Sequence, residues 1–507
     1  MSSPAQPLAA SLVQSVDWLA IAPPTIAAVV GLVVLVADLF VAENRKTLLG
    51  WTSVAGLAAA TLMLLPLLDG DRSTFCLTGD ATVCSYTADR FTLVIQFLVL
   101  GGALLAALLS VTALKDAREE LPEGEYWFLL LSSAAGAALL PASRDLATLI
   151  VALEVASLPA FALVGLRYGD RKSSEAALKF FLSSVTATAV SLMGISFLYA
   201  STGTLYLTQV ADRIQNVDGQ LHTLAQTGVV LTLVGFAFKT AAVPFHFWVP
   251  DTYVGAPLPI AAYLSVIGKA VGFSGLILVT VVALPSYADV WGPALAALAA
   301  LTMTVGNVGA LRQQATRAYS AVRLLAWSSV GQAGYLLVPI AAAAYSGDAE
   351  KSIGSTVAYA LMYGAVNLGA FAVAALVGRA KSLNRVSDYR GLYASRPLSA
   401  LLLAFFLLCL AGLPPGIIGL FAKVTVFSAA VDAGLGWLAV IMAVNVVIAL
   451  FYYLQWTALL FRAPEGEPEK HRVPAPLTAA IALTGVLGIA LSGAPQLVLR
   501  FTDAALF

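Results

Sequence analysis

The sequence predicts an all-α polytopic membrane protein with about fourteen transmembrane helices. Three observations lead to this fold class. The 507 residues are 60% hydrophobic and only 11% charged, whereas an ordinary soluble protein is about 25% charged and needs those charges to cover its core. Apolar runs long enough to cross a bilayer recur along the whole chain. Basic residues concentrate in every second loop between these runs, a pattern typical of loops on alternating sides of a membrane.

The apolar runs mark the individual spans. A helix needs about 20 residues to cross the hydrocarbon layer. One run is much longer than this and contains two prolines, so we count it as a single interrupted span. The predicted spans lie at 18–41, 47–68, 91–114, 125–142, 146–166, 175–200, 227–249, 257–284, 291–311, 319–345, 354–378, 397–432, 435–461 and 474–494.

The basic loops predict the orientation of the chain. The positive-inside rule places loops rich in Lys and Arg in the cytoplasm. We therefore expect a multi-pass membrane protein with both termini outside the cytoplasm. The basic residues of these alternate loops are Arg45 and Lys46; Lys115 and Arg118; Arg167, Arg171 and Lys172; Arg312 and Arg317; Arg379, Lys381, Arg385, Arg390 and Arg396; and Arg462, Lys470 and Arg472.

Composition excludes several kinds of chemistry. Lys+Arg and Asp+Glu both number 28, and a balanced charge without a long basic run argues against a nucleic-acid partner. The three Cys are too few to hold an iron–sulfur cluster. The three His lie far apart in sequence, so they are poor candidates for paired haem ligands. Gly268 and Lys269 lack the upstream glycine of a phosphate-binding loop. We therefore expect no metal and no cofactor bound by this chain itself.

Two cysteines, Cys76 and Cys84, share the predicted external loop between the second and third spans. In an oxidising compartment such a pair can form a disulfide. In a reducing compartment both remain free thiols. The sequence leaves both alternatives open.

Two spans are interrupted at comparable positions. The seventh contains Pro244, and the twelfth contains Pro414 and Pro415; proline removes a backbone donor and clashes one turn back, so each helix should break. Matching breaks in two halves indicate an inverted repeat with an ion site near the midplane, and two unrelated packing kinks are the alternative. The repeats would be helices 4–8 and 9–13, which divides the chain into a three-helix segment 1–124, five-helix repeats 125–284 and 285–461, and a C-terminal loop and last helix 462–507.

Ionisable side chains inside the predicted spans are the candidate functional residues. Each costs about 2.5–3.5 kcal/mol at the bilayer centre on insertion scales, so a function is expected for it. Structural roles are the alternative: a lysine near a span end can extend to the interface, a carboxylate can neutralise a lysine, and a histidine can cap a broken helix. The candidates are Glu154, Lys179, Lys239, His246, Lys269 and Lys423.

These residue types suit proton transfer. Burial disfavours the charged form of lysine and a nearby carboxylate restores it, so a lysine beside Glu154 could hold or release a proton as the ion pair forms or opens. Water must link the sites, and unwound backbone beside Pro244 and Pro415 is where water is tolerated at membrane depth. The sequence therefore predicts a lateral proton relay.

Four segments carry a resemblance to a known family. They read YGDRKSSEAALKFFL, GFAFKTAAVPFHFWVPDTYVGAPLPIAAYLSVIGKAVGF, RLLAWSSVGQAGYLL and GLPPGIIGLFAKVTVF. Together they resemble the antiporter-like membrane subunits of respiratory complex I, the proton-pumping NADH:quinone oxidoreductase. The EAALKFFL segment, the length near 500 residues and a lysine at Lys423 favour the N-type members over the M-type and L-type members.

The resemblance implies a role for each candidate. Glu154 and Lys179 would form a charge-coupling pair, and Lys239 would be the central site. Lys269 with His246 would link two half-channels, and Lys423 would be the terminal proton site toward the outside. The chain departs from the family pattern in two places, and these departures leave Arg323 without an assigned role. They are Val322, where a lysine is common, and Gln332, where many members have histidine.

The resemblance also implies partners and cofactors. The neighbours would be M-type and K-type membrane subunits and the lateral helix of the L-type subunit, all in the lipid bilayer. FMN, iron–sulfur clusters and quinone would belong to other subunits of the complex. A subunit of a multi-subunit cation/proton antiporter or of a membrane-bound hydrogenase is a close alternative. A stand-alone solute transporter is a more distant one, and the buried charges argue against a purely structural scaffold.

Overall fold

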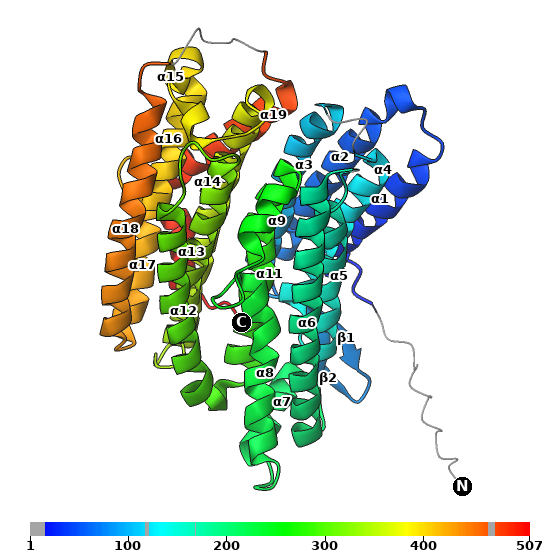
Figure 1. Cartoon of the computed structure of the whole chain (residues 1–507). Helices are drawn as coiled ribbons and strands as arrows, with labels where there is room; N and C mark the ends of the chain where they lie inside the picture. The colour runs from blue at the N-terminus through cyan, green and yellow to red at the C-terminus, as the bar shows by residue number, and fades with distance from the viewer. Residues whose placement is uncertain (1–15, 117–120, 168, 465–471) are drawn as a thin grey trace, which may run out of the picture.

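Long apolar helices that run side by side make up nearly all of the molecule (Figure 1). The computed structural model describes residues 16–116, 121–167, 169–464 and 472–507. Within these ranges, 11 helices are long and apolar enough to cross a membrane, and two shorter apolar helices, Ala22–Asp38 and Pro397–Ala411, accompany them. The predicted all-α membrane architecture is confirmed, while the count of fourteen spans stays a prediction.

The helices follow the predicted runs closely. Each predicted span overlaps one helix or one interrupted pair of helices. In chain order the α-helices are α1 Ala22–Asp38, α2 Thr47–Leu62, α3 Arg90–Asp116, α4 Glu123–Leu139, α5 Leu146–Val164, α6 Arg171–Thr202, α7 Leu207–Arg213, α8 His222–Thr240, α9 Val249–Gly255, α10 Leu258–Tyr263, α11 Lys269–Ile277, α12 Ala288–Leu311, α13 Ser320–Ala342, α14 Ala349–Ala380, α15 Leu392–Ser395, α16 Pro397–Ala411, α17 Ile417–Asp432, α18 Gly436–Leu460, α19 Ala475–Gly493 and α20 Gln496–Leu499.

Both predicted interruptions are present. The seventh span is split into α8 and α9, and the backbone leaves the helix at Ala241, whose φ is +67°. The twelfth span is split into α16 and α17, and Gly412 ends α16 with a φ of +83°. A left-handed residue after the last turn stops a helix, and the prolines that follow lack the N–H needed to resume it. Each break leaves helix ends inside the bundle.

Small residues let neighbouring helices approach closely, as is typical of membrane bundles. A Cβ on Gly194 of α6 would lie 2.4 Å from the backbone nitrogen of Thr232 on α8. In the second half, a Cβ on Gly306 of α12 would lie 2.2 Å from the backbone nitrogen of Gly331 on α13. Any larger side chain at these positions would force the paired helices apart.

A short β-hairpin is the one departure from the all-α prediction within the described chain. It pairs β1, Arg72–Leu77, with β2, Asp80–Ala88, in antiparallel fashion, where the sequence predicted an irregular external loop. The segment carries several β-branched and aromatic residues, which favour strands. The strand register sets Cys76 opposite Cys84, and the two form a disulfide. The hairpin lies at the lower end of the bundle in Figure 1.

The disulfide gives a first testable prediction. Replacing Cys84 with serine should destabilise the hairpin by about 2–3 kcal/mol, because the bond closes a short loop in the unfolded chain. Hydrogen exchange of the β1 and β2 amides in the assembled complex measures this, with Cys409→Ser as the control because Cys409 is a buried free thiol elsewhere. Unchanged protection of the hairpin amides in Cys84→Ser would contradict the assignment.

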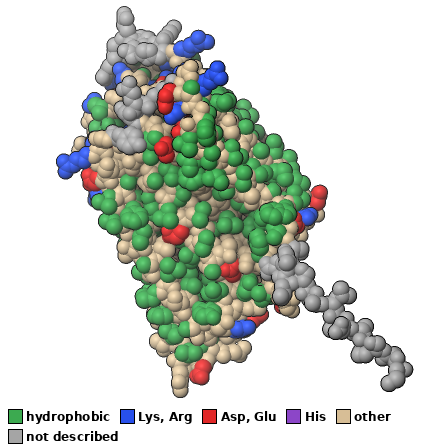
Figure 2. Space-filling model, turned by 90° about the vertical axis from the view of Figure 1, so that its right-hand side faces the viewer, with side chains coloured by type: hydrophobic (Ala, Val, Ile, Leu, Met, Phe, Trp, Pro, Cys, Tyr) green, Lys and Arg blue, Asp and Glu red, His purple; other side chains and the backbone are tan. Residues whose placement is uncertain are grey.

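Basic side chains gather mostly at one end of the molecule (Figure 2). Most Lys and Arg side chains visible in Figure 2 lie at its upper end, whereas hydrophobic side chains cover the middle of the molecule. This is the distribution expected when helices cross a bilayer and their basic loops share one side.

Candidate functional site

Lys239 lies in the last turn of α8, directly before the first break, and its side chain is buried. Its Nζ lies 3.4 Å from the Ser184 hydroxyl on α6. The same nitrogen lies 5.0 Å from the ring centroids of both Phe161 and Phe180, within the range of a cation–π contact. The free carbonyls at the end of a helix also favour positive charge. The break therefore creates a position inside the bundle where the Lys239 ammonium is stabilised.

Glu154 is the carboxylate of this first site. It is half-buried on α5, and Thr188 of α6 donates a hydrogen bond to its Oε1 at 2.7 Å. It is close enough for its charge to act on Lys239. The site thus combines a buried amine with a hydrogen-bonded carboxylate on the neighbouring helix.

The pairing of Glu154 with Lys179, which the family resemblance implied, is not formed in the described structure. Lys179 is 46% exposed and binds Glu175 at 2.7 Å and Asp251 at 3.1 Å. Glu175 lies one turn earlier on the same helix, the spacing at which opposite charges meet. These two carboxylates hold the Lys179 ammonium at the periphery.

Asp251 is not among the predicted candidates, because its place at the end of a span suggested an interfacial or loop-ordering residue. Its other carboxylate oxygen accepts a hydrogen bond from Arg323 of α13 at 3.2 Å. Asp251 therefore bridges Lys179 of α6 and Arg323 of the second half. Asp251 lies in the first turn of α9, just after the break, where a carboxylate is favourable. The structure therefore gives Arg323, which had no predicted role, a defined partner.

A small cavity, lined mostly by apolar residues but with several hydroxyl-bearing side chains, adjoins Lys239. It has a volume of about 20 Å³, which is room for about one water molecule. Ser133, Ser157 and Tyr263 contribute hydroxyl groups to its lining, and the Ser133 and Tyr263 hydroxyls lie 2.9 Å apart. The cavity leads from Lys239 toward the helix that carries Lys269.

Lys269 follows a π-helical turn, η5, at Leu264–Gly268. Wide turns of this kind frequently occur at functional sites in α-helices. Its side chain is buried, and its Nζ donates to the Ser329 hydroxyl at 2.5 Å and lies 3.5 Å from the Tyr253 hydroxyl. All of these partners are neutral, so hydroxyl groups solvate a buried amine.

Hydroxyl groups continue from Ser329 into the second half. The Ser329 and Tyr363 hydroxyls lie 2.7 Å apart. The adjacent Ser328 hydroxyl lies 2.5 Å from that of Tyr453 on α18. The side-chain nitrogen of Gln332, one turn further along α13, lies 3.1 Å from the same Tyr453 hydroxyl. Ser328, Ser329 and Gln332 thus connect α13 to α14 through Tyr363 and to α18 through Tyr453.

Aromatic rings connect these polar groups to Lys423. Gln332 accepts a hydrogen bond from Tyr359, whose ring stacks on Tyr335 with centroids 6.0 Å apart. Tyr335 in turn lies under the Lys423 ammonium, 5.3 Å from the ring centroid. Lys423 Nζ donates to the Ala411 carbonyl of α16 at 2.8 Å. The second break therefore also presents a helix end to a buried lysine.

His246 lies apart from Lys269. It sits half-buried in the first break, its ring centroid is 5.5 Å from that of Trp327, and its buried Nδ1 has no hydrogen-bond partner among the described residues. The contacts that the described structure gives Lys269 do not involve it. The implied role of Lys269 and His246 in linking two half-channels stays a prediction; in the described structure the short hydrogen bond of Lys269 is to Ser329.

The sequence reasoning also missed the neutral members of the site. Serine, tyrosine and glutamine are common in helices and carry no signal of their own. One clue was available: the WSSVGQAGY segment places several hydrogen-bonding side chains within three turns of an apolar helix. Among the residues that the structure describes, no group of His, Cys, Asp and Glu could hold a metal ion.

Comparison with known proteins gives a consistent result. The family model of NADH:quinone oxidoreductase and Mrp antiporter transmembrane subunits matches residues 143–449. The chain is 73% identical to NADH-quinone oxidoreductase subunit N 2 of Streptomyces griseus, over 98% of this chain and 96% of that protein.

Solved structures show the same architecture. A chain of respiratory complex I from Thermus thermophilus is 31% identical, with a TM-score of 0.75, and the match covers 94% of this chain and 98% of that one. A chain of the Mrp complex from Dietzia has a TM-score of 0.81 at 21% identity, covering 96% of both chains, and shows the shared fold alone. The chain therefore belongs to the antiporter-like family of complex I membrane subunits, alongside its N-type members, and is a multi-pass subunit of a membrane complex.

Proposed function

We propose that this chain translocates protons across the membrane through the buried line from Lys239 to Lys423, driven by quinone reduction in neighbouring subunits. One observation carries the proposal. Three buried lysines, Lys239, Lys269 and Lys423, lie in the interior of apolar helices with neutral hydrogen-bonding groups between them. Burying an amine without a paired carboxylate is costly, so their retention is best explained by a task that needs them.

The chemistry of each group suits one step of the transfer. A lysine amine holds a proton or releases it, and hydroxyl groups both donate and accept hydrogen bonds, so they pass a proton along. The cavity beside Lys239 has room for the water that would join it to the Tyr263 and Ser133 hydroxyls. Ser329 would take a proton from Lys269, and the tyrosines and Gln332 would lead toward Lys423. Glu154 would favour the charged form of Lys239.

The setting of this activity is part of the proposal. The basic loops would face the cytoplasm and both termini the outside of a bacterial cell membrane. M-type and K-type subunits and the lateral helix of the L-type subunit would be the neighbours. FMN, iron–sulfur clusters and quinone would reside on other subunits, and this chain would contribute no redox chemistry. Proteins that co-purify with it test this: peripheral iron–sulfur and flavin subunits are expected, and a set of antiporter subunits alone would contradict it.

Ser329 offers the sharpest test of the line itself. In Ser329→Ala, Lys269 loses its shortest hydrogen bond toward the second half, and proton pumping driven by NADH oxidation should fall by at least about tenfold. The control is Ser274→Ala on α11, the helix that carries Lys269. In the described structure the Ser274 hydroxyl bonds only to carbonyls of its own helix. Pumping is measured by a pH-sensitive dye in vesicles containing the assembled complex. Equal pumping in both variants would contradict the proposed route.

A further inference from the structure

The wide turn η5 before Lys269 departs from the ordinary bonding of an α-helix. The backbone N–H of Lys269 donates to the Val266 carbonyl, three residues back. An α-helix would use the carbonyl of Ser265, four residues back. Side chains of neighbouring helices that bond to this turn are therefore in a position to set its shape.

Two side chains of α14 bond to Ser265 in this turn. The Tyr363 hydroxyl donates to the Ser265 carbonyl at 2.8 Å, and the Asn367 amide nitrogen donates to the Ser265 hydroxyl at 2.7 Å. The Ser265 hydroxyl lies 2.7 Å from the Ala262 carbonyl. Because a carbonyl only accepts, Ser265 must donate to Ala262 and accept from Asn367. This direction fixes the orientation of the Asn367 amide.

Asn367 makes this contact from the interior of the bundle. Its side chain is fully buried, and its amide oxygen has no hydrogen-bond partner among the described residues. A leucine of similar volume would fill the same space without burying an amide. The bond to Ser265 is therefore the contact that distinguishes asparagine from an apolar residue here.

The same bonds orient the hydroxyl groups beside Lys269. The Tyr363 hydroxyl gives its one proton to the Ser265 carbonyl, so Ser329, 2.7 Å away, must donate to the Tyr363 oxygen. The Ser329 oxygen then accepts from Lys269 Nζ at 2.5 Å. These bonds leave the helix at Lys269 and return to it at Ser265, one turn earlier. The position of the Lys269 amine thus depends on how the turn is held.

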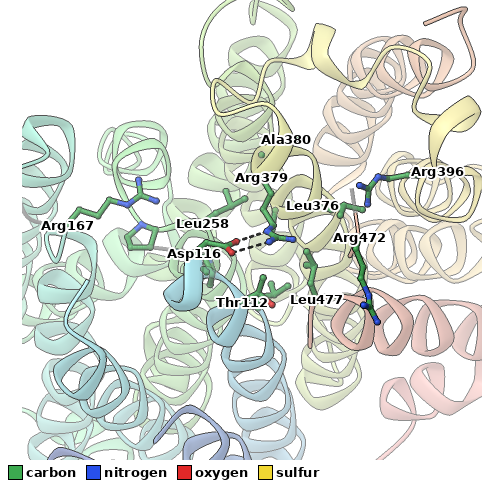
Figure 3. A pocket seen from close by; sticks show the side chains of 16 residues that line it. Thr112, Asp116, Arg167, Leu258, Leu376, Arg379, Ala380, Arg396, Arg472 and Leu477 are labelled. Atoms are coloured by element: carbon green, nitrogen blue, oxygen red, sulfur yellow. Dashed lines mark hydrogen bonds and ion pairs between the residues drawn. The ribbon is translucent and has the colours of Figure 1, made fainter. Parts of the chain in front are cut away.

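Helix α14 is itself fixed against α3. A Cβ on Gly364 of α14 would lie 2.6 Å from Leu98 of α3 and 3.1 Å from Val266 of the turn, so the three segments are in close contact. Near the C-terminal end of α14, Arg379 forms a bidentate ion pair with Asp116 of α3 at 2.6 and 3.1 Å (Figure 3). The side chains of α14 therefore meet the turn from a supported helix.

We propose that Asn367 is a positioning residue for Lys269: its amide holds the π-turn in the shape that brings the amine to the Ser329 hydroxyl. The inference rests on the proposed proton line, in which Lys269 passes its proton to Ser329. It adds to that line a residue that is neither acid nor base and acts only through the turn.

Asn367→Leu in the assembled complex tests the proposal. In a high-resolution electron cryomicroscopy map, Lys269 Nζ should leave hydrogen-bond distance of Ser329. Proton pumping driven by NADH oxidation should fall by about tenfold, because a small displacement of a reacting group is costly. The control is Thr356→Val, about three turns away on α14, whose hydroxyl bonds to the Leu336 carbonyl of α13. It should match the wild type.

A second variant shows whether Asn367 acts through Ser265. Ser265→Ala removes the group to which Asn367 donates, so it should also move Lys269 and lower pumping by about tenfold. The double variant should lose no more than either single variant, whereas two independent effects would multiply to about a hundredfold. If Asn367→Leu does not assemble, the position of Lys269 in Ser265→Ala gives the same test.

The outcomes separate this inference from the proposed function. Normal pumping in Ser329→Ala contradicts the proton line, whereas the position of Lys269 in the Asn367→Leu map tests the role of Asn367 in either case. An unmoved Lys269, losses that multiply in the double variant, or an equal loss in Thr356→Val would each overturn the proposal.

Discussion

Replacing Lys239 with alanine is expected to abolish proton pumping, with a fall of at least about a hundredfold in pumping-linked quinone reduction. Lys239 is the amine nearest the first break, buried against two aromatic rings and within the influence of Glu154. Without it, no buried amine remains beside the first break to hold the proton. NADH-driven quinone reduction and vesicle acidification of the purified complex measure the loss.

Two further variants keep this result interpretable. Lys239→Met preserves most of the volume and should be as inactive as Lys239→Ala, which would exclude a packing defect as the cause. Lys351→Ala removes an exposed lysine at the start of α14 and should leave the rate unchanged. Assembly is checked by native gel in each case. Normal pumping in a fully assembled Lys239→Met complex would refute the central role of this residue.

Gly272→Val is expected to have a large structural effect at the first site. A Cβ on Gly272 of α11 would lie 2.4 Å from the backbone nitrogen of Thr240 and 2.7 Å from the carbonyl carbon of Lys239. Backbone atoms cannot move aside as a flexible side chain can, so α11 and the last turn of α8 must separate. Overpacking of this kind costs about 3 kcal/mol. The complex should assemble poorly, and thermal unfolding should begin at a lower temperature.

Gly101→Val is the matched control for this substitution. A Cβ on Gly101 of α3 would meet no atom within 4 Å, so the same chemical change should alter stability by only about 0.5 kcal/mol. Equal loss of assembly in both variants would mean that any valine in a glycine position is harmful and that the contact between α8 and α11 is not special.

The fold could be predicted from sequence because its signals are local. Spans follow from the length of apolar runs, and both interruptions follow from Pro244, Pro414 and Pro415, since proline acts on its own helix. The hairpin at Arg72–Ala88 was missed because an assignment of spans from apolar runs treats each polar segment between them as a loop. Its β-branched and aromatic residues favour strands, but the segment is short.

The site could be predicted only in part, for a physical reason. Lys239, Lys269 and Lys423 stand out because charge is costly inside a membrane. Tyr363 and Ser329 do not stand out, because a neutral hydroxyl is tolerated in any helix and its value depends on what faces it. The implied pairing of Glu154 with Lys179 is also not formed, because the partner of a side chain depends on what faces it.

Sequence places Glu154 and Lys179 on adjacent spans, but the direction of each side chain decides the partner. Lys179 reaches Asp251, and Glu154 faces Thr188.

The most direct test of the account is a map of ordered water in the assembled complex by high-resolution electron cryomicroscopy. We predict water in the cavity beside Lys239, within hydrogen-bond distance of its Nζ and of the Tyr263 hydroxyl, and an unbroken series of hydroxyl groups or water from Lys269 to Lys423. A dry gap in this series, closed by hydrocarbon side chains in every state of the working complex, would contradict the account.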